Sequence, residues 1–327
     1  MPPEISTIKT ILMKVEEINN VAVIGAGLMG HGIAQEFALA GYDVRLHDLD
    51  GEKLRNAEEN IRGNLAMLTG LGLVTKEEAA SSHRHITACT VLTDALVEAD
   101  VVIEAVFEDL NLKQETFRLL DKSCPPRTIL ASNTSTLLPG LLASVTHRPE
   151  KVLVAHYFNP PYLLPLVEIV RHEETSEETV QTMYGLLKKI GKTPVIVQKE
   201  VPGFVGNRLQ AALFREALAI VRDGIATPED VDIVVKNGFG RRLAAAGVFE
   251  IWEIAGWDLI SAICGNLFPN LDASTGTPPL LKGMVDRGEL GTKTGKGFYE
   301  WTPETALALK RRIAQILARI AQERNTQ

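Results

Sequence analysis

Among the seven histidines of this 327-residue sequence, His156 has the setting best suited to proton transfer. It ends the apolar run VLVAH and is followed by the turn sequence YFNPPY. Ligands of open α/β sheets bind beyond the carboxyl ends of strands, and an imidazole titrates near neutral pH. Glu168 follows in LVEIV, where its carboxylate could hold the imidazole in one tautomer and stabilise the protonated ring. The two residues suggest a base for a hydroxyl proton, although an ordinary core histidine and a buried ion pair fit the same pattern.

A glycine-rich loop follows the apolar run VAVI and opens a helical segment. The loop GAGLMG consists of Gly25, Gly27, Leu28, Met29 and Gly30. Its three glycines allow a sharp turn, close approach of the backbone to a pyrophosphate, and tight packing of helix on strand. Asp48 ends the next expected strand, where a carboxylate accepts from the adenine-ribose hydroxyls and repels a 2′-phosphate. The pattern predicts NAD as cofactor and not NADP, and the alternative is a glycine turn that binds no dinucleotide.

A third polar segment, SNTST at 132–136, also follows an expected strand. Its hydroxyl and amide groups could contact the nicotinamide ribose or a substrate carbonyl. They could equally form an N-cap cluster for a helix that begins near Leu137. The local pattern leaves both interpretations open.

The elements that must position these residues are short apolar strands alternating with amphipathic helices over the first 200 residues. Besides the two strands around the glycine loop, strands are expected at 101–106, 128–132, 152–158, 166–170 and 193–197. This alternation predicts an α/β fold, a doubly wound Rossmann-type domain with a parallel sheet covered on both faces. After Pro202 the strand pattern stops and only helical patterns follow, which predicts a smaller all-helical domain.

The expected domains are an N-terminal extension at 1–18, an NAD-binding domain at 19–200, and a helical domain for substrate binding and dimerisation at 201–327. In the extension, apolar residues recur near helical spacing: Ile5, Ile8, Ile11, Leu12 and Val15. We expect a short amphipathic helix packed on the body or on a second subunit, in preference to a targeting segment.

Composition excludes several functional classes. With 34 Lys plus Arg against 41 Asp plus Glu, the net charge of -7 gives no general attraction to nucleic acid or to an anionic membrane. Three widely separated cysteines form neither a disulfide framework nor a zinc motif, and no His/Asp cluster has metal-ligand spacing. No apolar run is long enough to span a bilayer, and the first residues lack a leader pattern. We expect a cytoplasmic protein with a small-molecule substrate and no metal.

Six separated segments carry a family resemblance over about residues 20 to 301. They are GAGLMGHGIAQ, EAVFEDLNLKQETF, SNTST, HYFNPPYLLPLVEIV, PGFVGNRL and LGTKTGKGFYEW. Together they resemble the NAD-dependent 3-hydroxyacyl-CoA dehydrogenase family, and 3-hydroxybutyryl-CoA dehydrogenases in particular. The resemblance implies a homodimer joined through the helical domain.

The same resemblance implies roles for individual residues. His156 would be the general acid/base and Glu168 its partner, while Ser135 and Asn207 would contact the reacting oxygen and the thioester carbonyl. The cofactor positions would be Gly25, Gly27, Gly30, Asp48, Glu108, Lys113, Ser135 and Asn159.

The sequence departs from the family pattern where coenzyme A would bind. Asn64 stands at the position of an expected serine, Leu71 near an expected lysine, and Pro165 at the position of another lysine. A CoA with fewer cationic partners loses charge-assisted hydrogen bonds, each worth roughly 1.5 to 3 kcal/mol. The segment NPPYLLPLVE also resembles the branch that acts on free small hydroxy acids, such as L-gulonate and carnitine dehydrogenases.

Arg241 and Arg242 precede Gly247-Val248-Phe249-Glu250, which stands where the family has a GPFE turn. With Asn64, they are the candidate substrate-binding residues, because a guanidinium can bind a carboxylate through two parallel hydrogen bonds. Surface charges or an interface pair are the alternative. The main functional hypothesis is a 3-hydroxyacyl-CoA dehydrogenase. The others are a dehydrogenase of a free hydroxy acid or ring hydroxymethyl compound, and a non-catalytic NAD-binding protein.

Overall fold

The computed structural model describes residues 14–324. They form two compact units: one runs up to Gly206 and resumes at Ile313, and the other is Asn207–Arg312. The helix predicted within 1–18 falls mostly on residues 1–13, outside the described part of the chain. Within that part, Val15–Glu17 forms a 3-10 turn (η1), and Val15 packs against the core.

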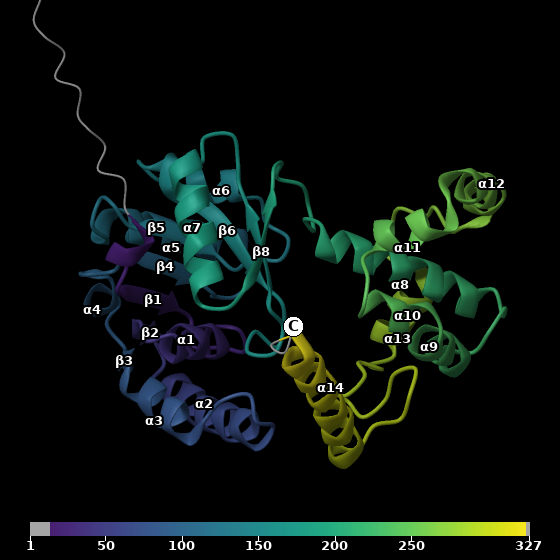
Figure 1. The fold of residues 1–327 in the computed structure, drawn as a ribbon, viewed down its shortest axis with the longest axis horizontal. Helices are drawn as coiled ribbons and strands as arrows, with labels where there is room; N and C mark the ends of the chain where they lie inside the picture. Colours follow the sequence, from purple (N-terminus) through teal and green to yellow (C-terminus); the bar gives the residue numbers. More distant parts are fainter. Residues whose placement is uncertain (1–13, 325–327) are drawn as a thin grey trace, which may run out of the picture. The chain divides into compact units, whose positions relative to one another are not determined.

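The first unit is built on one eight-stranded sheet in the order β3-β2-β1-β4-β5-β6-β7-β8 (Figure 1). The strands are β1 Asn20–Ile24, β2 Asp43–His47, β3 Ile86–Cys89, β4 Val101–Glu104, β5 Ile129–Ser132, β6 Val152–Tyr157, β7 Leu166–Val170 and β8 Thr193–Val197. β1 lies between β2 and β4, so the connections leave β1 in opposite directions and create a crevice at its carboxyl end. The predicted doubly wound α/β class is confirmed.

Two features of the sheet differ from the expectation. Strand β3 was not predicted, because its four residues are only partly buried and carry no strong apolar alternation. The sheet is also not wholly parallel: β7 runs antiparallel to β6, while every other neighbouring pair is parallel. The connection 158–165 contains no helix, and a parallel return would require a crossover of a dozen or more residues.

Helices cover both faces of this sheet. They are α1 Gly30–Leu39, α2 Gly51–Gly70, α3 Lys76–Arg84, α4 Leu92–Leu96, α5 Leu110–Ser123, α6 Pro139–Ala143 and α7 Glu177–Lys189, with a 3-10 turn η2 at Pro149–Lys151. Alternate residues of β1 enter different cores: Val21 and Val23 pack on the side of α1, α2 and α7, whereas Ala22 and Ile24 pack on the side of α4, α5 and α6. Burial on both faces holds the strand ends, and hence the site, in fixed positions.

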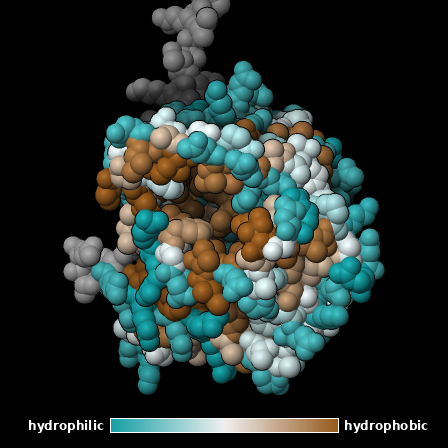
Figure 2. All heavy atoms as spheres, turned by 90° about the vertical axis from the view of Figure 1, so that its right-hand side faces the viewer, coloured by the Kyte–Doolittle hydropathy of each residue, from teal (hydrophilic) through white to brown (hydrophobic). Residues whose placement is uncertain are grey.

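The second unit is helical, as predicted. It contains α8 Gly206–Arg222, α9 Pro228–Asn237, α10 Phe239–Leu243, α11 Val248–Ala255, α12 Trp257–Leu267, η3 Phe268–Asn270, α13 Pro279–Asp286 and the first part of α14 Pro303–Arg324. Only four of its residues are buried, namely Leu218, Ala219, Ile260 and Met284. Many apolar side chains of this unit are correspondingly exposed. Figure 2 shows patches of hydrophobic residues, coloured brown, on the face of the molecule turned toward the viewer.

The end of α14 belongs to the first unit, whereas the expected helical domain extended to residue 327. Ala314 packs against Leu68 and Leu163, and the Gln322 amide donates to the carbonyl oxygen of Leu71 at 2.6 Å. The helical pattern predicts the helix but not the part of the chain on which it packs. Among the described helices, none is long and apolar enough to cross a membrane.

Candidate active site

His156 and Glu168 are cross-strand partners in the antiparallel β6/β7 pair. They share the sheet face of Val154 and Val170, which are paired in the same ladder. Their side chains meet with Nδ1 of His156 2.9 Å from Oε2 of Glu168. Since an ionised carboxylate can only accept, Nδ1 carries the proton and Nε2 keeps its lone pair. The imidazole is only 3% exposed, so this geometry presents one basic nitrogen in a largely dry setting.

The second oxygen of Glu168 is held by the backbone. Oε1 accepts from the amides of Val205 at 3.0 Å and Gly206 at 2.8 Å. Burial raises the pKa of the Glu168 carboxyl, but the hydrogen bonds from His156 and the two amides outweigh it and hold the pKa below its ordinary value. Glu168 is therefore an anion at neutral pH, able to stabilise a protonated imidazole.

The glycine loop has the shape needed by a dinucleotide. A β-carbon on Gly25, whose φ is +105°, would lie 2.6 Å from the carbonyl oxygen of Ala105, and one on Gly30 would lie 1.8 Å from that of Gly25. At Gly27, no heavy atom of the described chain lies within 4 Å of such a carbon, so the backbone faces open space there. No side chain caps α1, which leaves its positive end available to a phosphate. These residues fit NAD.

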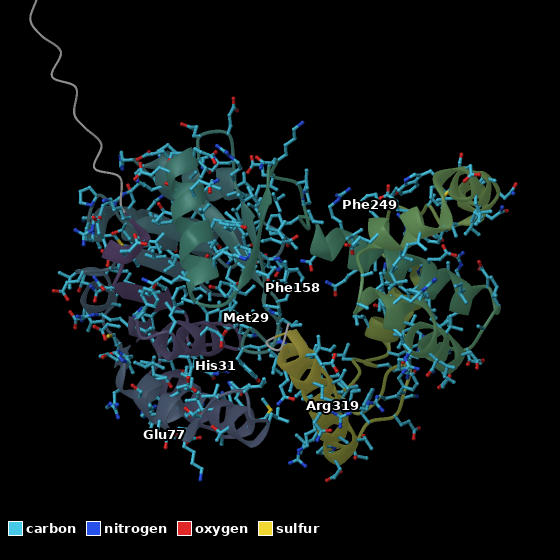
Figure 3. The ribbon with its side chains drawn as sticks, viewed as in Figure 1. Met29, His31, Glu77, Phe158, Phe249 and Arg319 are labelled. Carbon is cyan, nitrogen blue, oxygen red and sulfur yellow. The ribbon has the colours of Figure 1, made fainter. Side chains whose placement is uncertain are left out.

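Figure 3 labels two residues that mark this edge of the sheet, Met29 before α1 and Phe158 just beyond β6. Met29 is partly buried against the core, and the neighbouring Leu28 is exposed. Phe158 lies beside the His156–Glu168 pair, with its ring centroid 4.7 Å from that of His156. The loop and the strand end thus belong to the same carboxyl edge, although β4 and β5 separate β1 from β6.

Asp48 connects the end of β2 to the glycine loop. Its Oδ2 accepts from the amide of Ala26 at 3.0 Å, and its Oδ1 accepts from that of Asp50 at 3.1 Å. Lys53, which the sequence pattern does not predict as part of the site, places Nζ 3.9 Å from Oδ1 and 5.1 Å from the ring centre of Phe107. Each carboxylate oxygen keeps a further lone pair that can accept from a ribose hydroxyl.

Replacing Asp48 by alanine should weaken NADH binding by about tenfold or more, because hydrogen bonds to a charged acceptor are worth roughly 1.5 to 3 kcal/mol. It should also relax discrimination against NADPH, since the repelling charge is removed. Fluorescence titration with NADH and NADPH measures both effects. Asp50→Ala is the matched control, because Asp50 is a neighbouring carboxylate that caps α2. Unchanged NADH affinity in Asp48→Ala would show that the adenosine site lies elsewhere.

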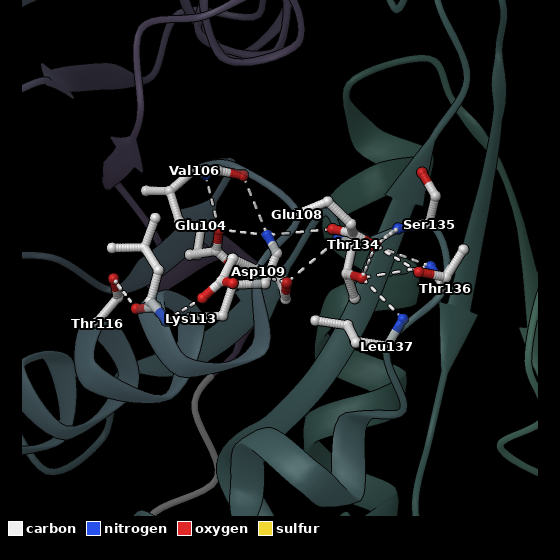
Figure 4. Close-up of polar contacts among 12 residues, drawn as sticks. Glu104, Val106, Glu108, Asp109, Lys113, Thr116, Thr134, Ser135, Thr136 and Leu137 are labelled. Atoms are coloured by element: carbon white, nitrogen blue, oxygen red, sulfur yellow. Dashed lines mark hydrogen bonds and ion pairs between the residues drawn. The ribbon is translucent and has the colours of Figure 1, made fainter. Parts of the chain in front are cut away.

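Glu108 organises the SNTST loop (Figure 4). Its Oε1 accepts from the hydroxyls of Thr134 at 2.5 Å and Thr136 at 2.9 Å, and from the amides of Ser135 and Thr136, both at 3.1 Å. Burial raises the pKa of Glu108, but these hydrogen bonds and the charge of Lys113 hold it below its usual value. None of the polar side chains caps α6, which begins at Pro139 after the uncapped Leu138. The segment therefore does not cap α6, although Thr134 Oγ1 accepts from the amides of Thr136 and Leu137 ahead of that helix.

Lys113 lies beneath this loop and is 1% exposed. Its ammonium group has three oxygen partners: Glu104 Oε1 at 2.7 Å, the Val106 carbonyl at 3.2 Å and Glu108 Oε2 at 3.6 Å. Two of its three protons are donated to Glu104 and Val106, and the Glu108 carboxylate lies at ion-pair distance. Lys113 therefore holds Glu104 and Glu108 in place, and its contribution to the cofactor site stays a prediction from the family resemblance.

Glu104 is a further site residue that the sequence pattern did not predict. It is fully buried at the end of β4, where it also accepts from the Ser132 hydroxyl at 2.6 Å and the Val106 amide at 2.7 Å. The available signal was a glutamate at the end of the apolar run VVIE, at the same sheet edge as Ser132. Asn133 extends the framework to β6, because its Oδ1 accepts from the amide of Tyr157, next to His156, at 2.9 Å.

The remaining candidates are divided between the two units. Asn159 is exposed in the loop after β6, and Asn64 lies on α2 with a buried Nδ2 that has no partner among the described residues. Asn207 is the first residue of the second unit, directly after Gly206, and Arg241 and Arg242 lie in α10 of that unit. In residues 14–324, no group of three His, Cys, Asp or Glu side chains is arranged to hold a metal.

Two family profiles match consecutive parts of the chain. The 3-hydroxyacyl-CoA dehydrogenase NAD binding domain matches residues 20–201, and the C-terminal domain of the same family matches residues 203–301. The chain belongs to the 3-hydroxyacyl-CoA dehydrogenase family. This NAD-dependent family consists of oxidoreductases that act on CH–OH groups, and NAD is the cofactor of this member.

Relatives in the family differ in the substrates for which they are named. The chain is 40% identical over 291 residues to a probable 3-hydroxybutyryl-CoA dehydrogenase of Bacillus subtilis, covering 89% of this chain and 100% of that protein. A solved (S)-3-hydroxybutyryl-CoA dehydrogenase from Ralstonia eutropha has a TM-score of 0.73 at 33% identity, with 87% and 99% of the chains covered. A solved 5-formyl-3-hydroxy-2-methylpyridine 4-carboxylic acid 5-dehydrogenase, described as an NAD+-dependent dismutase, has a TM-score of 0.87 at 32% identity, with 93% and 98% covered.

Proposed function

We propose that this family member interconverts a 3-hydroxyacyl-CoA and the corresponding 3-oxoacyl-CoA, with His156 as general acid/base. The observation that carries the proposal is the 2.9 Å contact between His156 Nδ1 and the ionised Glu168, which leaves Nε2 as the proton acceptor. The match to the Bacillus subtilis relative over 291 residues supports the thioester substrate.

Each residue has a defined task in this reaction. When bound, NAD would supply the acceptor for the hydride that leaves the carbinol carbon. His156 takes the hydroxyl proton at Nε2, and Glu168 stabilises the imidazolium that results. Ser135 and Asn207 contact the reacting oxygen and the thioester carbonyl, while Glu108 positions the loop that carries Ser135. Gly27, Asp48 and Asn159 contribute to the cofactor site.

A second candidate is a free acid that carries a secondary alcohol or a ring hydroxymethyl group. Two observations favour it: the absence of the expected serine at Asn64 and of the expected lysines at Leu71 and Pro165, and the similarity to the pyridine-carboxylate dehydrogenase. In this case Arg241 and Arg242 would bind the substrate carboxylate through paired hydrogen bonds.

Substrate panels decide between the two candidates. NADH oxidation is measured with acetoacetyl-CoA, with free acetoacetate and with the formyl pyridine carboxylate named above. NAD reduction is measured with carnitine and L-gulonate. Turnover with the thioester alone supports the proposal, whereas turnover with a free acid alone contradicts it and makes Arg241 and Arg242 the first residues to replace. Lack of turnover across both panels contradicts both candidates.

We also infer that the second unit pairs with a second copy of the chain. Its four buried residues form too small a core for more than 100 residues, and a hollow of about 850 Å³ between α8 and α9 is lined mainly by apolar side chains. Exposed residues at or near it include Leu213, Phe214, Ile225 and Val234. Sedimentation should give about twice the 35.7 kDa chain mass, and a monomer at micromolar concentration would contradict the inference.

A cytoplasmic location remains part of the proposal. The three unbridged cysteines support it, and cell fractionation tests it.

A further inference from the structure

The segment before α8 contains an unusual turn. Pro202 and Gly203, with φ of +77° at the glycine, form a turn closed by a 3.1 Å hydrogen bond from the amide of Phe204 to the carbonyl of Val201. Proline followed by glycine at positive φ is the pattern of a type II turn. Phe204 then adopts φ of +50°, the only positive value at a non-glycine residue in the described chain. Such a conformation crowds the β-carbon and persists only where the surroundings impose it.

Burial of the Phe204 side chain supplies that constraint. The ring is 1% exposed and packs with Val154, Val170 and Val197 in a separate small core. It also meets the imidazole of His156 edge-on, with centroids 5.5 Å apart and planes at 61°. The strained residue is therefore anchored directly beside the catalytic pair.

The backbone after Phe204 carries the functional consequence. The amides of Val205 and Gly206 both point at one oxygen of Glu168, at 3.0 and 2.8 Å. The other oxygen is left to His156 Nδ1. In this way the left-handed residue sets the direction of two consecutive N–H groups, which in turn set the orientation of the carboxylate.

We propose that Phe204 is a positioning residue of the catalytic pair: its left-handed conformation directs two backbone amides to Glu168, and its ring supports the His156 imidazole. The inference rests on the proposed role of His156 as the base. It assigns a function to the PGF turn beyond connecting the two units. Glu168 is paired with His156 on β6 and with Val195 on β8, and the turn contributes backbone amides. Of these neighbours of Glu168, His156 is the one that can titrate.

Leucine and isoleucine at position 204 separate backbone conformation from packing. The two side chains have nearly the same volume, but isoleucine is β-branched and resists positive φ much more strongly. We expect Phe204→Ile to have a kcat about tenfold or more below that of Phe204→Leu, at similar NADH affinity. The limb of its kcat/KM profile that His156 controls is the acid limb for alcohol oxidation and the basic limb for ketone reduction. It should move to lower pH by about half a unit or more, because a displaced Glu168 stabilises the imidazolium less. These assays use the substrate from the panels above that the unmodified protein turns over.

A substrate-free measurement keeps this inference separate from the proposed function. In proton NMR, the Nδ1 proton of His156 should give a downfield signal, assigned by its absence in His156→Ala. Phe204→Ile should shift or broaden it more than Phe204→Leu does. Phe117→Leu, at another fully buried phenylalanine away from the pair, should leave the signal unchanged.

Equal kcat, equal pH profiles and equal Nδ1 signals in the two Phe204 variants would overturn the proposal. If Phe204→Ile does not fold, Gly203→Ala strains the same turn without altering the ring and should produce the same changes. Normal kcat and a normal Nδ1 signal in that variant would also overturn it. A changed Nδ1 signal in an enzyme that turns over none of the panel substrates would support the positioning role while contradicting the proposed function.

Discussion

Replacing His156 by alanine is expected to lower kcat by about a thousandfold, within the roughly 10² to 10⁴ range attributed to a positioned general base. Nε2 is the only imidazole nitrogen left to accept a proton, because Nδ1 is committed to Glu168. Water cannot easily replace it, since His156 and Glu168 are almost fully buried. NADH affinity should stay within about twofold, because the imidazole acts on the substrate's proton and not on the cofactor.

Steady-state assays measure kcat with the substrate from the panels that the unmodified protein turns over. The fluorescence of NADH measures cofactor binding. His147→Ala is the matched control, because this histidine also contacts a carboxylate, Asp121, but its side chain is 98% exposed. The control should keep its turnover. Turnover near that of the unmodified protein in His156→Ala would remove His156 from the mechanism.

Replacing Lys113 by methionine is expected to reduce the free energy of unfolding by about 3 to 5 kcal/mol, the usual effect of breaking a buried ion pair. The ammonium group is the counter-ion of Glu104, which has no exposed surface, and it also lies 3.6 Å from Glu108 Oε2. Methionine fills the same space but leaves a carboxylate without its cation in a medium of low polarity.

The double variant Lys113→Met/Glu104→Gln should recover part of the loss, because it removes the unpaired charge. The exposed pair Arg45–Glu98 provides the control: Arg45→Met should change the unfolding free energy by only about 0 to 1 kcal/mol. Urea unfolding is followed by far-UV circular dichroism, because Trp252, Trp257 and Trp301 all lie in the second unit. Unchanged stability in Lys113→Met, combined with a large loss of NADH affinity, would instead support direct cofactor binding by Lys113.

Several features of the site were visible in the sequence because they depend on local pattern. The glycine spacing, the aspartate at the next strand end and the alternation of strands and helices predict a Rossmann-type sheet for NAD. His156 and Glu168 could be predicted as site residues because each is a titratable side chain within an apolar strand pattern. Their pairing remained a hypothesis, since periodicity alone gives neither strand direction nor register.

Tertiary structure decided the features that depend on distant partners. The antiparallel direction of β7 makes His156 and Glu168 direct neighbours, and a shift of one residue would place Glu168 on the opposite face of the sheet. The burial of Lys113 between Glu104 and Glu108 arises because β4, α5 and the loop after β5 converge, which no spacing along the chain reveals. Phe204 adopts positive φ because a core assembled from three strands holds its ring, against its intrinsic backbone preference. The sequence by itself determined which residues could take part, whereas long-range packing decided which side chains meet and in what conformation.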